Sequence, residues 1–206
     1  MLLVVFEDRI RAIVDRVEAQ RQRPGTADWF GVYKHQFRLN PPLPQAEVAA
    51  FESLHSISLP EDYRQFLLLA GNGGAGPYYG VAPLSEWDYW FEMVDGCTDL
   101  LASPCPFVDE QTIGPEWSEQ LPREREDWYR GSMHICDQGC TYVARLVVTG
   151  PSRGRVFNLD IQGNGTPSFA KDASFIDWYE RWLDQAQVGE PPPWFGLDKP
   201  AYSKTG

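Results

Sequence analysis

Hydrophobic residues recur at intervals of three and four positions in four stretches of the chain, which is the period of an amphipathic helix. The first stretch runs from Leu2 to about Gln22, where "RPGTADW" ends it. A second can begin at Pro44, and a third follows "SLPEDY". The fourth, which Asp172 or Ser174 can cap, has an aromatic face that we expect in the core. This face consists of Phe175, Trp178, Tyr179 and Trp182.

The third helix carries signals at both of its ends. Ser58 and Glu61 have the S-x-x-E spacing of a capping box, and Pro60 is tolerated in a first helical turn. Gly71 stands where a left-handed C-terminal cap is expected. The sequence therefore predicts a short helix that ends in a glycine-rich loop.

The glycines after this helix satisfy G-x-G-x-x-G at Gly71, Gly73 and Gly76. A dinucleotide site needs a strand before this motif and a helix after it, whose amides bind the pyrophosphate. Here a helix comes first, and "GPYYG" cannot begin another one. We therefore interpret Asn72, Gly73 and Gly74 as residues that turn the chain with positive φ angles.

Three runs rich in valine, isoleucine, tyrosine and phenylalanine predict successive antiparallel strands. They are "SMHICDQG", "TYVARLVVTG" and "GRVFNLDI", and "YYGVAPL" could form a further short strand. Prolines favour an irregular, acidic segment at about 85–130, and a Pro- and Gly-rich C-terminal arm at 187–206. With 206 residues, the chain can form a single domain over residues 1–186.

The turn "TGPSRG" satisfies the G-x-S-x-G pattern of a nucleophile elbow at Gly150, Ser152 and Gly154. That elbow connects a strand to a helix, whereas a strand follows this serine. A hairpin turn is therefore the better interpretation. A serine hydrolase that uses Ser152 and His134 remains as an alternative.

Four cysteines give no framework for a disulfide or a metal. Cys136 and Cys140 form one close pair, but Cys97 and Cys105 lie eight residues apart and far upstream. Since a structural zinc site usually needs two close pairs, we expect free thiols, no bound metal and no cofactor. No apolar run is long enough for a membrane span or a secretory signal, so we expect a cytoplasmic protein.

Negative charge is concentrated in one part of the chain. Residues 86–128 contain 12 acidic residues and two arginines, within a chain of formal net charge −11. This charge disfavours a nucleic acid as partner and favours a basic protein. The segment also holds four tryptophans, which either pack in the core or serve as contact residues. Our candidate interface consists of Glu86, Trp87, Asp88, Trp90, Glu116, Trp117, Glu119, Glu124, Glu126, Asp127 and Trp128.

Three blocks of the sequence together resemble the SUKH superfamily. They are "LPEDYRQFLLLAGNGGAGPYYGVAPL", "HICDQGCTYVARLVVTGPSRGRVFNLD" and "FIDWYERWLD", and they occur in the order typical of this family. The resemblance implies an α+β fold, with a mixed, mostly antiparallel sheet and helices packed against it. It also implies that the L-P-x-D-Y helix and its N-G-G exit define the fold, and it supplies no catalytic motif.

The superfamily includes a fungal cell wall assembly regulator and many bacterial immunity proteins against polymorphic toxins. The resemblance therefore implies a protein that binds a cognate toxin domain without acting as an enzyme. Many such toxins are nucleases with basic surfaces, which an acidic protein could cover. The alternative is a non-enzymatic regulatory scaffold like the fungal member. The oligomeric state stays open.

Overall fold

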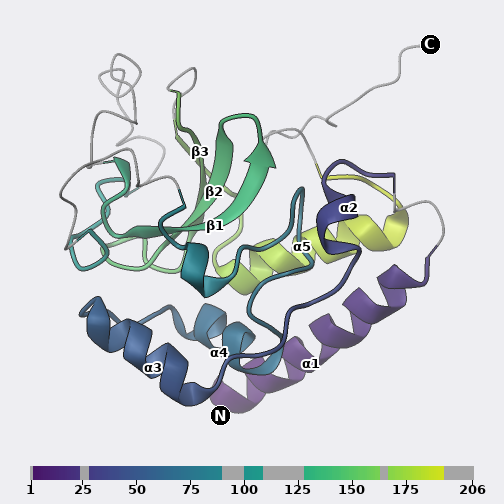
Figure 1. The fold of residues 1–206 in the computed structure, drawn as a ribbon, viewed down its shortest axis with the longest axis horizontal. Coiled ribbons are helices and arrows are strands. Elements are labelled where there is room, and N and C mark those ends of the chain that lie inside the picture. The colour runs from purple at the N-terminus through teal and green to yellow at the C-terminus, as the bar shows by residue number, and fades with distance from the viewer. Residues whose placement is uncertain (1, 24–27, 90–99, 109–127, 163–166, 193–206) are drawn as a thin grey trace.

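The computed structural model describes residues 2–23, 28–89, 100–108, 128–162 and 167–192, and these residues form an α+β fold (Figure 1). The helices are α1 (Leu2–Arg21), α2 (Val32–His35), α3 (Gln45–Leu54), α4 (Glu61–Leu69) and α5 (Phe175–Val188), with the 3-10 helix η1 (Leu84–Glu86). The strands are β1 (Ser132–Gly139), β2 (Tyr142–Val147), β3 (Val156–Asp160) and β4 (Ser168–Phe169). They form one sheet in the order β1-β2-β3-β4.

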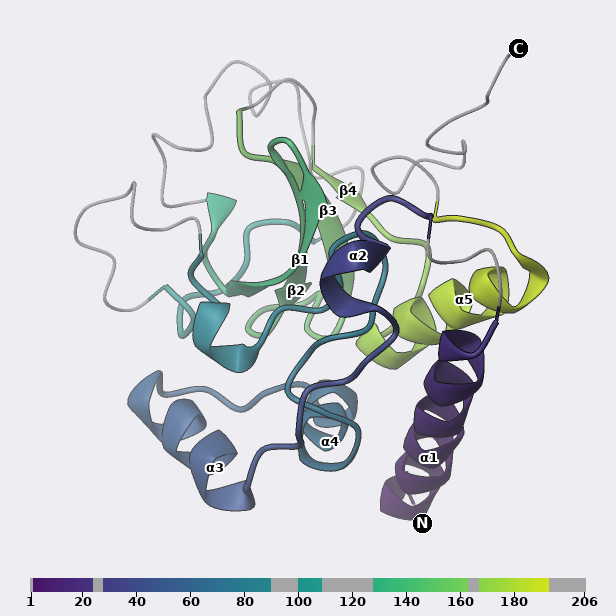
Figure 2. The ribbon, with the colours of Figure 1, turned by 45° about the vertical axis from the view of Figure 1, so that its right-hand side comes forward.

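The predicted fold class is confirmed, with helices packed against one side of the sheet (Figures 1 and 2). Within the described ranges every strand pairs antiparallel to its neighbour, and the implied parallel component is not seen there. The segment "YYGVAPL" is not a strand, because Val81 forms only single bridges to Gly74 and Cys136. The expected turn between β2 and β3 is present, with positive φ angles at Gly150 and Gly154.

Both faces of the sheet are covered, as strand β2 shows. Since successive side chains of a strand point to opposite faces, Ala144 and Leu146 enter the core formed with α1, α4 and α5. Val143 and Val147 enter a second core on the other face. Residues 100–107 and 128–129 supply much of that second core, so the middle and the end of the acidic segment are integral to the fold.

The core between α4 and α5 confirms the expected aromatic face. Phe175 and Tyr179 contact Phe66 of α4 at ring distances of 5.2 and 5.0 Å, and Trp178 and Trp182 are buried as well. Ser174 caps α5, because its Oγ accepts a hydrogen bond from the backbone N–H of Asp177 at 3.3 Å.

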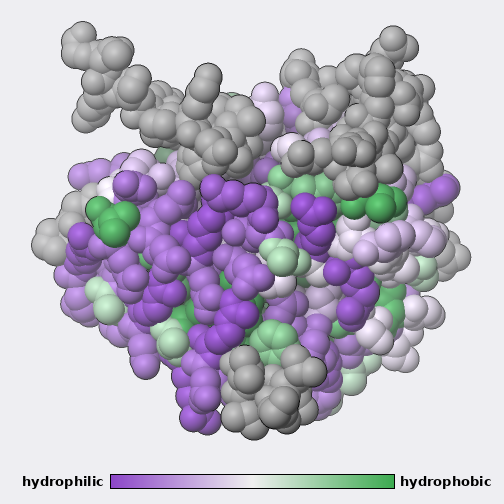
Figure 3. All heavy atoms as spheres, turned by 180° about the vertical axis from the view of Figure 1, so that it is seen from behind, coloured by the Kyte–Doolittle hydropathy of each residue, from purple (hydrophilic) through white to green (hydrophobic). Residues whose placement is uncertain are grey.

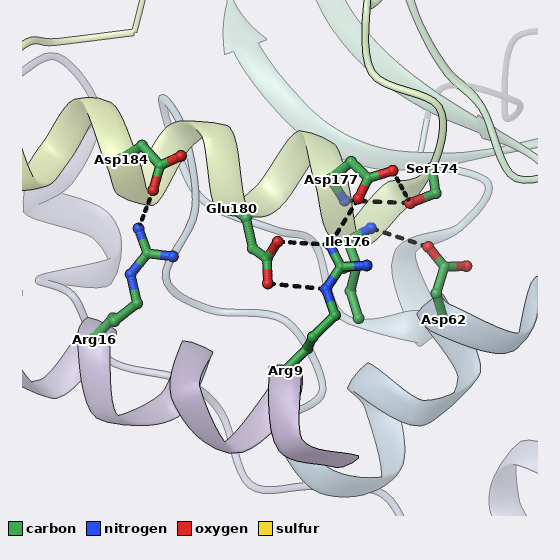
Figure 4. A network of polar contacts seen from close by, with 8 residues as sticks. All are labelled: Arg9, Arg16, Asp62, Ser174, Ile176, Asp177, Glu180 and Asp184. Atoms are coloured by element: carbon green, nitrogen blue, oxygen red, sulfur yellow. Dashed lines mark hydrogen bonds and ion pairs between the residues drawn. The ribbon is translucent and has the colours of Figure 1, made fainter. Parts of the chain in front are cut away.

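Asp62 connects the beginnings of two helices (Figure 4). It lies in the first turn of α4 and is buried, and its Oδ2 accepts a hydrogen bond from the backbone N–H of Ile176 at 3.0 Å. One carboxylate therefore lies near the positive dipole ends of both α4 and α5. This contact gives a physical reason for the aspartate in the L-P-x-D-Y motif.

Ion pairs fix the direction in which α1 crosses α5 (Figure 4). Arg9 Nη2 lies 2.7 Å from Asp177 Oδ1 and 2.6 Å from Glu180 Oε2, and Arg16 Nη2 lies 2.5 Å from Asp184 Oδ1. These side chains are partly exposed, so each pair contributes at most about 1 kcal/mol. Ile10, Ile13 and Val17, which are buried beside them, provide most of the stabilisation of α1.

The predicted end signals of α4 are wrong. The helix begins after Pro60 without a side-chain cap, and Glu52 Oε1 accepts the hydrogen bond from the Leu59 N–H at 2.8 Å. The Ser58 capping box is therefore not formed, and Glu52 instead fixes the chain just before the helix. At the other end, Ala70 keeps a right-handed conformation, and Gly71 does not have the positive φ of a left-handed cap.

The glycine loop that follows is packed too tightly for side chains. Gly73 and Gly74 have φ angles of 75° and 100°, as predicted, but the positive φ expected at Asn72 is wrong. A Cβ atom on Gly74 would lie 2.4 Å from the carbonyl oxygen of Arg38, and one on Gly73 would lie 2.4 Å from that of Val81. The Tyr179 hydroxyl donates to the Ala75 carbonyl at 2.7 Å, which ties the loop to α5.

Replacement of Gly74 should destabilise the fold by strain and by a clash together. We expect Gly74→Ala to lower the free energy of unfolding by about 1–3 kcal/mol more than Gly189→Ala. Gly189 is the matched control, because it has a φ of 81° and nothing within 4 Å of its Cβ position. It should therefore show only the left-handed penalty, about 1–2 kcal/mol. Chemical denaturation measures both values, and equal losses would show that the packing argument is wrong.

Loss of the Asp62 carboxylate should uncouple α4 from α5. We expect Asp62→Ala to lower the free energy of unfolding by about 1–3 kcal/mol, because the buried Ile176 N–H then lacks an acceptor. Asp62→Asn keeps an acceptor oxygen and should cost less. Asp8→Ala, at an exposed site on α1, is the control and should stay within about 0.5 kcal/mol of wild type. A loss for Asp62→Ala as small as that of the control would contradict this role.

Candidate functional site

The short helix η1 forms a ridge that is fixed at both of its ends. At its start, the Leu84 N–H donates to Asn72 Oδ1 at 2.7 Å, which ties it to the glycine loop. At its end, the carbonyl of Trp87 accepts a hydrogen bond from the His134 N–H of β1 at 2.8 Å. We call residues 84–89 the ridge. Its position is thus set by the core elements on either side.

Most side chains of the ridge face solvent. Glu86, Asp88 and Tyr89 are exposed, Leu84 is buried, and Trp87 is half-buried. The Trp87 ring packs edge-on against His55 at 4.6 Å, where α3 ends. The ridge therefore presents one anchored tryptophan between two exposed carboxylates.

A groove of about 290 Å³ lies between α3 and the ridge, and we call it the Trp87 groove. Its apolar wall consists of Leu43, Phe51, Leu54 and Trp87. Leu54 is 78% exposed, which is unusual for a leucine beside an aromatic cluster. Glu47 also lines this groove and no lysine or arginine does, so the site is apolar with a negative rim.

A larger groove of about 700 Å³ also borders the ridge, between α2 and β1, and we call it the Lys34 groove. Lys34 and Arg38 line it from the α2 region, Glu86 and Tyr89 from the ridge, and His134 from β1. Its volume is within the usual range of binding pockets. The ridge therefore borders two grooves with different chemistry.

Three predicted interface residues come together on the ridge, namely Glu86, Trp87 and Asp88. Trp128 does not join them, because it is fully buried with its ring 5.9 Å from Phe107 in the second core. Its place in the core is a correction, since a partner cannot contact a buried ring. The other candidates, Trp90, Glu116, Trp117, Glu119, Glu124, Glu126 and Asp127, lie outside the described residues.

Sequence reasoning missed the partners of Trp87. The sequence pattern gave Phe51, Leu54 and His55 no functional role, yet they line the groove beside Trp87. One signal was present in the composition of α3, which has six apolar residues of which only Val48 is buried. An apolar helix that buries so little points to a surface available for contact.

The buried Arg145 anchors the second core beside these grooves. Its Nε donates a hydrogen bond to Ser132 Oγ at 3.0 Å, and its Nη2 donates one to the Ser132 carbonyl at 2.7 Å. Its guanidinium carbon lies 5.0 Å from the centroid of the Tyr129 ring. Burial lowers the pKa of Arg145 to about 10, which leaves it charged at neutral pH. A cation therefore lies under the face of the sheet to which the acidic segment connects.

Ser152 is held inside the turn between β2 and β3. Its side chain is buried, and its hydroxyl oxygen lies 2.6 Å from the Val108 carbonyl and 3.0 Å from that of Phe107. The hydroxyl therefore donates to backbone oxygens, and a strand follows the turn. This geometry fits a hairpin turn and lacks the exposed serine of a nucleophile elbow.

The described residues contain no cluster of histidine, cysteine and carboxylate side chains that could hold a metal ion. Cys136 is buried, with its thiol 3.3 Å from the Pro77 carbonyl, whereas Cys140 is exposed. Burial raises the pKa of the Cys136 thiol well above its ordinary value, so this sulfur stays protonated. Among the helices in the described ranges, none has the length and apolar character that a membrane span requires.

The chain matches the SMI1/KNR4 family (SUKH-1) over residues 42–181. This match runs from just before α3 into α5, covers more than half of the chain, and shows that the protein belongs to the family. It confirms the resemblance seen in the sequence. A search of the curated proteins gives no match.

Two buried histidines should make stability depend on pH. Burial lowers the pKa of His35 to about 4, and burial together with the nearby Arg145 charge lowers that of His134 to about 3. Because histidine in the unfolded chain has a pKa of about 6.5, the unfolded state gains protons first as the pH falls. The contribution of the two neutral histidines to the free energy of unfolding is therefore fully present above pH 6.5. It is lost as the pH falls below this value, by up to about 1.4 kcal/mol per pH unit for each residue.

Urea denaturation at several pH values between about 7 and 4.5 tests this dependence. His134→Phe should show a shallower loss of unfolding free energy than wild type over this range, because one of the two groups is absent. Identical slopes would show that His134 is not held in its neutral form.

Proposed function

We propose that this protein is an immunity protein, which neutralises a cognate toxin domain by direct binding and catalyses no reaction. Family membership supports a binding role, because the SUKH family includes immunity proteins and regulators. The acidic balance of the chain supports a basic partner, such as a nuclease domain. We place this action in the cytoplasm, with residues 1–186 working as one domain.

The observation that carries this proposal is the combination of Trp87 with the apolar groove beside it. Binding hot spots are typically large aromatic side chains, held in place and surrounded by a polar rim. Trp87 is held against His55, and Leu54 stays exposed next to it. An apolar side chain of the toxin would fill this groove.

Charge around the Trp87 groove selects the partner. Glu47 lines the groove, Glu86 and Asp88 flank Trp87 in the sequence of the ridge, and no lysine or arginine lines the groove. Lysine or arginine residues on the toxin would pair with these carboxylates and increase the rate of association. We propose that the interface continues into the acidic segment, through Trp90, Glu116, Trp117, Glu119, Glu124, Glu126 and Asp127.

A regulatory scaffold is the second candidate, because the matched family also includes the fungal regulator. Co-expression with a candidate toxin domain, sought among the neighbouring genes, separates the two functions. An immunity protein should restore growth and co-purify with the toxin. Growth arrest that persists despite soluble expression of the chain would overturn the immunity proposal and favour the scaffold.

Changes on the ridge should weaken toxin binding without unfolding the protein. Trp87→Ala should mainly speed dissociation and cost about 2 kcal/mol of binding free energy, as loss of a hot spot does. The double variant Glu86→Lys/Asp88→Lys should slow association, most clearly at low salt. Surface plasmon resonance measures both rates.

The matched control is Glu7→Lys/Asp8→Lys, which makes the same change of charge at exposed sites on α1. It should retain more of the association rate than the ridge variant. If the two double variants slow association equally, only net charge matters and the ridge is not the contact surface.

A further inference from the structure

The Lys34 groove has cations on one wall, although the chain as a whole is strongly acidic. Lys34 and Arg38 are both exposed, and neither forms an ion pair with a carboxylate in the described ranges. Lys34 Nζ lies 4.1 Å above the Tyr79 ring, which holds the ammonium at the groove. Two positive charges thus stay available within a molecule of formal net charge −11.

His134 lines the same groove and lacks a partner for part of its ring. The residue is only 2% exposed, and its Nδ1 forms no hydrogen bond within the described residues. Buried polar atoms are nearly always paired, and an unpaired one destabilises the fold. Tyr89 of the ridge packs near this ring, at 5.6 Å. A ligand in the groove could supply the missing hydrogen bond.

The backbone beside this groove adopts an unfavourable conformation at three residues. Gln36, Phe37 and Tyr78 have φ angles of 50°, 53° and 52°, in the left-handed region that side chains disfavour. Gln36 lines the groove, and the other two directly precede the lining residues Arg38 and Tyr79. Since such strain concentrates at functional sites, it supports a binding role for this groove.

The carboxylates of the groove leave the cationic wall accessible. Asp137 Oδ1 already accepts a hydrogen bond from the Gly139 N–H at 2.7 Å. Glu86 belongs to the ridge, on the opposite wall from α2. The groove therefore has opposite charges on two walls, and its positive wall differs from the wholly negative rim of the Trp87 groove.

We propose that the Lys34 groove is a second recognition site, which receives a carboxylate-bearing loop of the same toxin. An aspartate or glutamate of that loop would pair with Lys34 and Arg38, and a polar group of the loop would bond the His134 ring. The inference rests on the proposed function. It adds that the toxin is basic and apolar where it meets Trp87 but acidic where it meets α2. Such opposite charges on the two sides of the ridge would fix the orientation of the complex.

The experiment compares two double variants of the full chain that change net charge equally. Lys34→Glu/Arg38→Glu removes the cationic wall, whereas Arg11→Glu/Arg21→Glu reverses two exposed charges on α1. If only net charge mattered, both variants would bind a basic toxin faster. We expect the groove variant to associate about tenfold more slowly than wild type, and the control not to slow. Stopped-flow or surface plasmon resonance at low salt gives these rates.

His134→Phe supplies a second test that separates binding from folding. The substitution keeps a flat aromatic ring, somewhat larger than imidazole, and removes the unpaired nitrogen, so stability at pH 7 should fall little. Toxin dissociation should become about fivefold faster, because one buried hydrogen bond is lost. A purely structural histidine would give the opposite pattern, with lower stability and unchanged binding.

The results separate this inference from the proposed function. Binding of the toxin by wild type and weaker binding by Trp87→Ala would support the immunity role. If in the same experiment the groove variant matches its control and His134→Phe dissociates at the wild-type rate, the second site is wrong while the immunity role stands. If wild type binds no toxin and restores no growth, both proposals are overturned. Slower association of the groove variant alone supports the second site.

Discussion

The close approach of the glycine loop to neighbouring backbone is the constraint on which the rest of the structure depends. Cβ atoms on Gly71, Gly73 and Gly74 would lie 2.3 to 2.4 Å from the carbonyl oxygens of three residues in two other segments. Backbone can pass backbone at this separation only where side chains are absent. The loop can therefore hold α5 through Ala75 and the ridge through Asn72 at the same time.

The ridge owes its functional potential to this anchoring. It lies between the glycine loop and β1, so its exposed side chains start from a fixed backbone. A preorganised surface loses less conformational entropy on binding than a flexible one. The grooves beside it differ in charge because α3 contributes an apolar wall and Glu47, whereas the α2 region contributes Lys34 and Arg38. Seen from behind, the described surface is mostly hydrophilic, with hydrophobic residues in places (Figure 3).

The acidic segment is tied into the fold where it begins and where it ends. It starts at the ridge, and residues 100–107 and 128–129 fill the face of the sheet that the helices leave uncovered. The buried Arg145 lies on that face, bonded to Ser132 and close to the Tyr129 ring. Because a buried cation loses its hydration, the hydrogen bonds to Ser132 and the contact with the Tyr129 ring help to offset the cost of burying Arg145.

The sequence by itself determined those features that depend on a few neighbouring residues. The helix period placed the aromatic face of α5 in the core, Ser174 capped that helix, and glycines marked the β2–β3 turn and the positive φ angles at Gly73 and Gly74. It also brought Glu86, Trp87 and Asp88 together, because they are consecutive. The family resemblance then gave the fold class from three blocks that no single pattern would have connected.

Only the tertiary structure decided which distant groups meet. Glu52 fixes the chain before α4, where a Ser58 capping box was expected, and Trp128 entered the core although the residues before it are acidic. The Lys34 groove combines α2, the ridge and β1, which lie up to a hundred residues apart, so no local pattern could reveal it. Local conformation follows from the steric and hydrogen-bonding preferences of adjacent residues. A groove follows from how buried faces pack against one another, and this packing depends on the whole chain.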